Sequence, residues 1–179
     1  MPILYLLRHT KPDVPQGICY GQTDVPLAAS FIEEVAHVKA KIMPCIEHRS
    51  VQIISSPLQR CLRLAEAISQ NAQDIVVDRR LQEMNFGAWE MHPWGSIDRF
   101  VMNAWMRDFV HVAPPLGESF IALVQRVWEA LYDILRSTHP SADIVLVIHA
   151  GVIRAIIARI LEIPLAKAFM LELEYGSLS

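Results

Sequence analysis

The hydrophobic positions of this chain form short apolar runs that alternate with stripes at helical spacing. The runs predict buried strands at residues 3–7, 51–55, 75–77, 144–148 and 168–173. They lack the strict alternation of a half-exposed strand, so they favour a parallel sheet that is covered on both faces.

Between the runs, apolar residues recur three and four positions apart, which is typical of one face of a helix. These stripes predict helices over residues 58–68, 120–134 and 152–160. Ser56 and Pro57 are suited to be the N-cap and first-turn proline of the first helix, and Ser119 can cap the second. Alternating strands and helices indicate an α/β fold. With no repeat or linker-like run, we expect a single domain over residues 1–179.

Residues 84–115 interrupt this alternation and are rich in methionine and aromatic side chains. Two interpretations are open, because pockets and cores are built from the same residue types. The segment is either a short helical insert that roofs a pocket or a long connection under which the aromatic side chains pack. The aromatic residues concerned are Phe86, Trp89, Trp94, Phe100, Trp105 and Phe109.

Composition narrows the class of protein. With 53% hydrophobic and 20% charged residues, the chain is typical of a compact globular protein. The net charge of -3 and the lack of a basic stripe argue against nucleic acid as a partner. The most apolar region is interrupted by His149, Arg154 and Arg159, which argues against a membrane span. Three cysteines without metal-type spacing favour reduced thiols, so we expect a cytoplasmic protein.

Charged side chains follow four of the predicted strands. Arg8 and His9 come directly after the first strand, Arg60 lies in the helix after the second, Glu83 follows the third and His149 ends the fourth. Ligands of open parallel sheets bind at the carboxyl ends of the strands. We therefore expect these five side chains to converge on one ligand.

The residue types at this edge favour an anion over a metal ion. Two histidines and a glutamate are usable zinc ligands, but two neighbouring arginines would repel a cation. Guanidinium groups instead suit a multidentate anion such as phosphate. The chain contains no Walker loop and no serine nucleophile elbow. The pattern thus favours a phosphate pocket, and we expect neither a metal nor another cofactor.

A mechanism follows from this set as a hypothesis. His9 would attack phosphorus and become a phosphohistidine. Arg8, Arg60 and a protonated His149 would hold the phosphoryl oxygens. Glu83 would protonate the leaving alkoxide and then take a proton from the hydrolytic water.

Residues 8–10, 55–60, 81–90 and 147–154 resemble the histidine phosphatase (phosphoglycerate mutase-like) superfamily, and they occur in the order typical of that family. The resemblance runs from the first strand to about residue 160. It implies a three-layer α/β/α sandwich with a mainly parallel central sheet, a phosphohistidine at His9 and a proton donor at Glu83.

Residues 17–27 and Thr10 are similar to the α-ribazole phosphatase subgroup, which removes the 5′-phosphate of α-ribazole phosphate during assembly of the cobalamin nucleotide loop. This similarity implies that Thr10, Gly21 and Gln22 bind substrate together with Arg8, Arg60 and His149.

The chain departs from the superfamily pattern, which usually has glycine at the positions of Thr10, Met91 and Ala150. Ala150 lies beside His149, and a positive φ there would be strained. Two alternatives to an α-ribazole phosphatase therefore stay open. One is a broad-specificity sugar-phosphate phosphatase or mutase-like enzyme, and the other is a phosphate- or partner-binding module whose catalysis has lapsed.

The expected partners are a small phosphorylated metabolite and, in a homodimer, a second copy of the chain; nucleic acid and membranes are not expected. The remaining histidines carry no predicted role in catalysis. We expect His37, His48 and His139 at the surface, whereas the spacing of His92 and His111 in the insert neither requires nor forbids contact with substrate.

Overall fold

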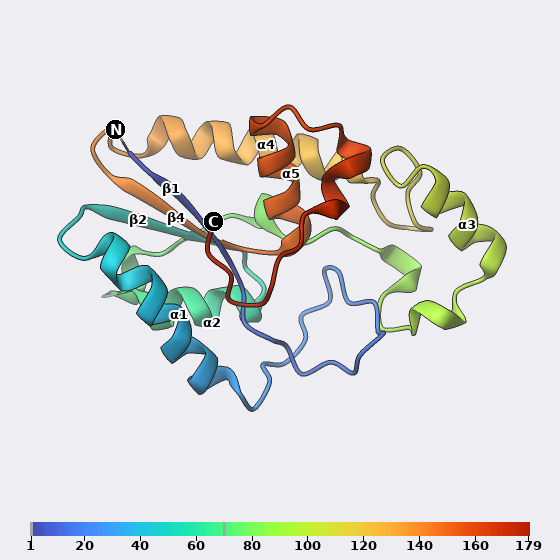
Figure 1. Cartoon of the computed structure of the whole chain (residues 1–179), viewed down its shortest axis with the longest axis horizontal. Helices are drawn as coiled ribbons and strands as arrows, with labels where there is room; N and C mark the ends of the chain where they lie inside the picture. Colours follow the sequence, from blue (N-terminus) through green and yellow to red (C-terminus); the bar gives the residue numbers. More distant parts are fainter. Residues whose placement is uncertain (1, 70) are drawn as a thin grey trace.

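The computed structural model describes residues 2–69 and 71–179. Its centre is a four-stranded, all-parallel sheet in the order β1-β4-β2-β3 (Figure 1). The strands are β1 (Leu4–Arg8), β2 (Val51–Ser55), β3 (Val76–Val77) and β4 (Asp143–Ile148). The α-helices are α1 (Phe31–Ile46), α2 (Gln59–Ile68), α3 (Arg99–Arg107), α4 (Phe120–Ser137) and α5 (Ala150–Ile160). Short 3₁₀ helices span Ala72–Asp74, Arg79–Leu81, Gly87–Trp89, Trp94–Ser96 and Leu165–Met170.

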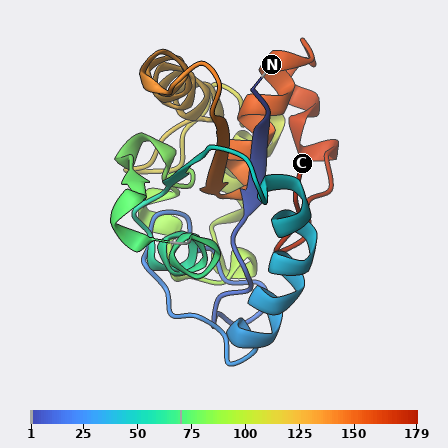
Figure 2. The ribbon, with the colours of Figure 1, turned by 90° about the vertical axis from the view of Figure 1, so that its left-hand side faces the viewer.

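Alternate residues of the central strand β4 belong to two separate cores. Leu146 and Ile148 pack in the cluster that includes α4 and α5, whereas Val145 and Val147 pack in the cluster that includes α1 and α2. Figure 2 shows α4 and α5 on one side of the sheet and α1 and α2 on the other. Because β4 is buried on both faces, its sequence is an unbroken apolar run. The predicted three-layer α/β/α sandwich is confirmed.

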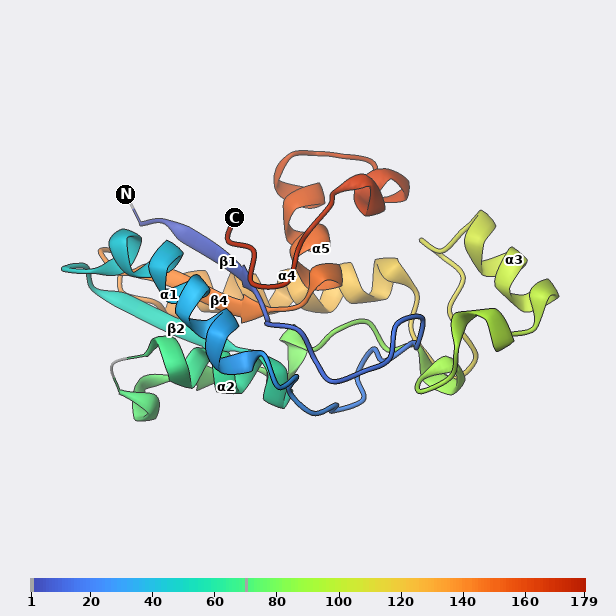
Figure 3. The same cartoon turned by 60° about the horizontal axis from the view of Figure 1, so that its bottom comes forward.

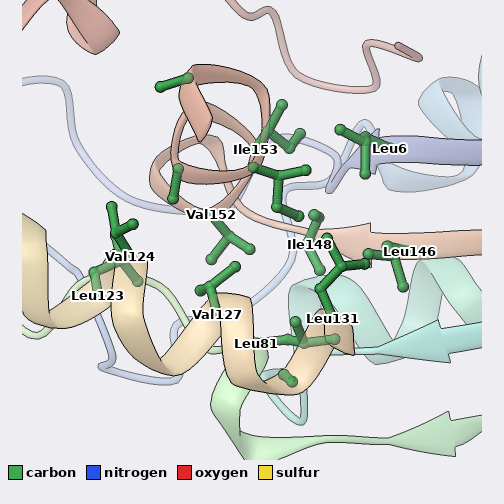
Figure 4. Close-up of a cluster of buried hydrophobic side chains, with 14 of the residues drawn as sticks. Leu6, Leu81, Leu123, Val124, Val127, Leu131, Leu146, Ile148, Val152 and Ile153 are labelled. Atoms are coloured by element: carbon green, nitrogen blue, oxygen red, sulfur yellow. The ribbon is translucent and has the colours of Figure 1, made fainter. Parts of the chain in front are cut away.

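The larger core lies between α4, α5 and the sheet. Val127 of α4 points toward Val152 of α5, and Leu131 of α4 points toward Ile148 of β4 (Figure 4). All four side chains are almost wholly buried, and each contributes about 1.5–3 kcal/mol relative to an exposed position. This packing fixes the first turn of α5 against the end of β4, which is where the site residues lie.

The predicted helices are confirmed as α2, α4 and α5, but one of the two predicted caps is wrong. Ser119 does cap α4, since its hydroxyl accepts from the amide of Ala122 at 3.4 Å. In α2, the side chain of Asp24 takes the role expected of Ser56: it accepts from the Gln59 amide at 2.8 Å. The Ser56 hydroxyl lies 2.8 Å from Nε2 of His149, and it accepts from the amide of Leu58, the residue before α2, at 3.4 Å. Helix α1 is not among the predicted helices. Its sequence contains Pro44 within the helix, a residue that usually breaks helices.

The predicted strand at residues 168–173 is wrong. Residues Leu165–Met170 form a 3₁₀ helix that packs against α5, and within this 3₁₀ helix Ala168 is buried and Met170 is exposed. The chain then continues as a segment without helix, residues 171–179, which turns at Tyr175 and Gly176 and whose end lies beside β1 (Figure 1). Leu6 and Ser179 exchange two backbone hydrogen bonds, at 2.8 and 2.9 Å. The free edge of β1 is therefore covered by these later residues.

The segment 84–115 combines both interpretations left open by the sequence. It contains two short 3₁₀ turns and α3, which lies apart from the sheet (Figure 3). Trp89 and Trp105 pack against each other with ring centroids 5.5 Å apart, as in a small core. Phe86 and Trp94 instead line a pocket. Among the described residues, no helix is long and apolar enough to cross a membrane.

Candidate active site

Four of the five predicted site residues line one cavity of about 110 Å³ at the carboxyl end of the sheet. Arg8 and His9 extend from β1, Arg60 lies in the first turn of α2 and Glu83 lies in the loop after the Arg79–Leu81 turn. His149 is absent from the cavity wall but is close behind it. The remaining lining residues are Ile18, Cys19, Tyr20, Gly21, Phe86 and Trp94.

The imidazole of His9 is arranged as a neutral nucleophile. Its Nδ1 lies 2.7 Å from the carbonyl oxygen of Thr10. A carbonyl can only accept, so Nδ1 carries the proton and Nε2 keeps its lone pair. Burial, followed by the charge of Arg60, holds the pKa of His9 well below its usual value. The ring is therefore uncharged at neutral pH and able to attack an electrophile.

His149 lies edge-on to His9, with ring centroids 5.1 Å apart, and is fully buried. Its Nε2 is 2.8 Å from the Ser56 hydroxyl and 3.4 Å from the thiol of Cys61. Burial and then Arg60 hold the pKa of His149 well below its usual value. The expectation of a protonated His149 is therefore wrong for the ligand-free protein. A phosphate dianion would favour the protonated form when it binds.

Both arginines keep part of their hydrogen-bonding capacity unused. Arg60, which is fully buried, donates from Nη1 to the Thr23 carbonyl at 2.9 Å and from Nη2 to the Gly21 carbonyl at 2.6 Å. Arg8 donates from Nη1 to the carbonyl of Leu173. The Nε atoms of both arginines and the hydroxyl of Thr10 are buried and have no partner within residues 2–69 and 71–179. Buried donors are normally satisfied, so unused ones beside a cavity suit an oxyanion.

The carboxylate of Glu83 is fixed from two sides. It accepts from the amide of Met84 at 2.8 Å and from the amide of Gly151, in the first turn of α5, at 3.1 Å. A helix N-terminus favours a negatively charged neighbour. Gly151 is required for this approach, because a Cβ there would lie 2.2 Å from Glu83 Oε1.

Glu90 links the Gly21–Thr23 loop to the segment that carries Glu83, and it is a residue that the sequence analysis missed. Its carboxylate accepts from the amides of Gln22 at 2.8 Å, Thr23 at 2.6 Å and Phe86 at 3.0 Å. Gln22, expected to bind substrate, directs its side-chain amide to the main-chain oxygen of Glu83 at 3.0 Å. Its observed contacts are thus with the protein. The one sequence signal for Glu90 was its own charge, within a segment that is otherwise rich in aromatic side chains.

A second missed group is the pair of Arg126 and Glu118, which lie 2.6 Å apart. Arg126 donates to main-chain oxygens of the segment from Arg80 to Glu83, and Glu118 accepts from the amide of Asn85 at 2.8 Å. The pair therefore holds the loop on which Glu83 is carried. The sequence signal was the charge of Arg126 next to apolar residues of the helix predicted over residues 120–134.

The departures from the superfamily pattern have different structural consequences. Ala150 is the first residue of α5 and is not in the left-handed region, so the strain considered for it is absent. Thr10 is buried and also has no positive φ. Met91, in contrast, has a φ of 63°, a conformation that favours glycine.

The histidines outside the site are all exposed, as expected for His37, His48 and His139. His92 and His111 do not line the cavity, and His111 pairs with Asp108 at 2.8 Å. In the described part of the chain, no three side chains among His, Cys, Asp and Glu lie close enough together to hold a metal ion.

Comparison with known proteins shows which family this chain belongs to. The model of the histidine phosphatase superfamily (branch 1) matches residues 4–179. A protein of Escherichia coli K12, adenosylcobalamin/alpha-ribazole phosphatase, is 29% identical over 186 residues, covering 97% of this chain and 86% of its own length. A probable phosphoglycerate mutase of Escherichia fergusonii is 32% identical over 183 residues, covering 98% of this chain and 82% of its own length.

A solved structure is also similar. Mycobacterial glucosyl-3-phosphoglycerate phosphatase in complex with VO3 matches with a TM-score of 0.83 and 26% identity, covering 98% of this chain and 90% of the other. These relatives have different names but match to similar extents. The comparisons therefore fix the family and leave the substrate undetermined.

Proposed function

The chain belongs to the histidine phosphatase superfamily and is a phosphoric monoester hydrolase, and we propose that it acts through a phosphohistidine on Nε2 of His9. The observation that carries this proposal is the protonation and hydrogen bonding of the His9 imidazole. It is a buried, neutral imidazole whose Nδ1 is committed to the Thr10 carbonyl, and it lines a cavity with two arginines.

The first step forms the bond between His9 Nε2 and phosphorus and breaks the bond between phosphorus and the ester oxygen. The leaving alkoxide takes a proton from the Glu83 carboxyl group. The Thr10 carbonyl stabilises the positive charge that the ring acquires, because it accepts from Nδ1. Arg8 and Arg60 stabilise the charge on the phosphoryl oxygens.

The second step reverses the roles. The Glu83 carboxylate takes a proton from water, and the water oxygen attacks phosphorus. The bond between phosphorus and Nε2 breaks, and its electron pair returns to the imidazole, which is neutral again. Inorganic phosphate leaves, and Glu83 is protonated and ready for the next ester.

For the substrate, we propose α-ribazole 5′-phosphate, consistent with a role in assembly of the cobalamin nucleotide loop. Residues 17–27 resemble that subgroup, and the E. coli relative carries a matching name. A third support is an apolar groove of about 540 Å³ lined by Trp94, Gly95, Met102, Trp105 and Met106. Trp94 also lines the phosphate cavity, so the groove adjoins it. A flat heteroaromatic base on the leaving ribose fits such a groove better than a phosphoglycerate carboxylate does.

A phosphoglycerate mutase-like or broad-specificity sugar-phosphate activity is the alternative, favoured by the 32% identity to the probable mutase. Purified protein assayed with α-ribazole 5′-phosphate, phosphoglycerates and sugar phosphates decides between them. We expect the highest kcat/KM for α-ribazole 5′-phosphate. Equal rates on all substrates would contradict the specific proposal.

The covalent intermediate is tested by mapping the label after incubation with a phosphate-labelled monoester and quenching in base. We expect label on His9 in the native protein and none in His9→Ala, with folding unchanged. Hydrolysis by His9→Ala at near the native rate would exclude His9 as nucleophile. The exposed His37 provides the matched control, since His37→Ala should retain full labelling.

A further inference from the structure

Two tyrosines from distant parts of the chain meet beside the phosphate cavity. The hydroxyls of Tyr20 and Tyr175 are 2.6 Å apart, although the residues are separated by 155 positions. Tyr20 lies in the loop that precedes Gly21, and Tyr175 lies in the turn within residues 171–179. Neither residue takes part in the chemical steps described above.

The ring of Tyr175 contacts both functional groups that follow β1. The guanidinium carbon of Arg8 lies 3.9 Å from the centroid of the ring, which is a close cation–π contact. The centroid of the His9 ring is 5.6 Å from the centroid of Tyr175. Two hydrogen bonds hold this segment in place: the amide of Gly176 donates to the His9 carbonyl at 3.1 Å, and the side chain of Arg8 donates from Nη1 to the carbonyl of Leu173.

Tyr20 has the corresponding position on the other arginine. The guanidinium carbon of Arg60 is 5.4 Å from the centroid of the Tyr20 ring, and Tyr20 itself lines the phosphate cavity. Burial, and then the hydrogen bond to Tyr175, raise the pKa of Tyr20. The hydroxyl therefore stays protonated, and the link between the two rings persists at neutral pH.

The electrostatic setting explains why aromatic rings are suited to this position. Within the described residues, neither Arg8 nor Arg60 forms a salt bridge with a carboxylate. A carboxylate would orient a guanidinium but would also neutralise the charge that a phosphate needs. A tyrosine face orients the cation and leaves its charge available.

We propose that Tyr20 and Tyr175 are positioning residues of the phosphatase, which together hold Arg8 against His9 and fix the guanidinium groups for the phosphoryl oxygens. This inference rests on the proposed function, since it assigns the tyrosine pair to the phosphate site of that reaction. It also gives the C-terminal segment a role in the active site. The pair acts through the arginines and forms no bond with substrate.

The test measures binding of orthovanadate, as a phosphoryl mimic, by titration calorimetry, together with kcat/KM. Tyr175→Leu removes the ring and should weaken vanadate binding about tenfold, as expected for loss of a partly desolvated cation–π contact. Tyr175→Phe keeps the ring and should change binding by less than about threefold. The loss of kcat/KM in Tyr175→Leu should be the same for aryl and alkyl phosphates, because Arg8 acts on the phosphate and not on the leaving group.

Tyr132 provides a matched control. It forms another tyrosine–arginine pair, with Arg136 at 5.4 Å, on the exposed surface of α4. Tyr132→Leu should leave vanadate binding unchanged. Vanadate binding by Tyr175→Leu equal to that of the native protein would overturn the inference while leaving the proposed function intact. A native protein that neither binds vanadate nor hydrolyses phosphomonoesters would overturn both.

A double-mutant cycle keeps the inference testable if Tyr175→Leu does not fold. Tyr20→Phe and Tyr175→Phe each remove the same hydrogen bond, so the double variant should bind vanadate no more weakly than either single variant. Additive losses would show that the two hydroxyls act independently, and would contradict a linked pair.

Discussion

The guanidinium of Arg126 donates from Nη2 to the main-chain oxygen of Glu83 at 2.9 Å. The same side chain donates to the carbonyls of Arg80 at 2.6 Å and Gln82 at 2.8 Å, and to both carboxylate oxygens of Glu118. One partly buried guanidinium group thus supports the loop of Glu83 through hydrogen bonds to its main chain. The position of the proposed proton donor depends on a residue that does not line the cavity.

Arg126→Lys should therefore impair catalysis without removing a reacting group. A single ammonium cannot reproduce five planar donors, so the loop of Glu83 should shift. We expect kcat for alkyl phosphates to fall about 10- to 100-fold, since a displaced Glu83 loses part of the about 10²–10⁴-fold that proton transfer supplies. Aryl phosphates, which need little proton donation, should be less affected. Arg136→Lys, on the exposed part of the same helix, is the control, and equal losses on both substrate classes would contradict this role of Arg126.

Gly151→Ala tests the close approach of α5 to Glu83. The added Cβ would lie 2.2 Å from Glu83 Oε1, so the carboxylate must move and lose its hydrogen bond to the helix amide. Displacement of a general acid should lower kcat for alkyl phosphates about 10²-fold. The neighbouring change Ala150→Gly leaves Glu83 in place and should cost only about 0.5–1 kcal/mol in the free energy of unfolding. Unaltered kinetics in Gly151→Ala would show that this contact is not needed.

Stability should fall when the pH is lowered through the titration range of free histidine. Burial keeps the pKa values of His9 and His149 well below 6.5 in the folded protein. Below about pH 6.5, the unfolded chain therefore binds protons that the folded chain does not. The free energy of unfolding, from urea denaturation, should decrease by up to about 1.4 kcal/mol per pH unit for each histidine until the folded pKa is reached.

Variants test whether the two site histidines cause this pH dependence of stability. His9→Asn combined with His149→Asn should flatten the stability profile between about pH 6.5 and pH 5.5, because the other described groups with a lowered pKa, Asp78, Asp143 and Arg154, titrate well outside this range. The exposed pair His37→Asn and His139→Asn should leave the slope unchanged. A native protein with constant stability over this range would contradict the neutral state inferred for the two site histidines.

Met91→Gly should stabilise the fold. Met91 has a φ of 63°, and a left-handed conformation costs a residue with a Cβ about 1–2 kcal/mol. Glycine avoids this strain but loses about 0.5–1 kcal/mol through the entropy of the unfolded chain. We expect a net gain of about 0.5–1 kcal/mol in urea denaturation. Met106→Gly, the same change within α3, should instead destabilise by about 1 kcal/mol, and loss of stability in both variants would exclude strain at Met91.

The sequence by itself determined the layered sheet and most of the site. Strands buried on both faces require unbroken apolar runs, and the residues directly after such runs must lie at one sheet edge. For this reason Arg8, His9, Arg60 and Glu83 could be brought to one pocket from their positions in the chain alone. The sequence also predicted that His149 would join them, whereas the structure places it behind the cavity wall. Local spacing also identified α4 and its cap at Ser119.

Only the tertiary structure decided whether the site histidines are charged and which residues hold Glu83 in position. The charge of His149 depends on how completely other elements exclude water from it, and the orientation of Glu83 depends on Arg126 and Gly151 from remote helices. Tyr175 reaches Arg8 because residues 177–179, which follow it, pair with β1. The apolar pattern had instead predicted a strand at residues 168–173. Burial and long-range contacts are properties of the packed chain, and no periodicity within a single segment encodes them.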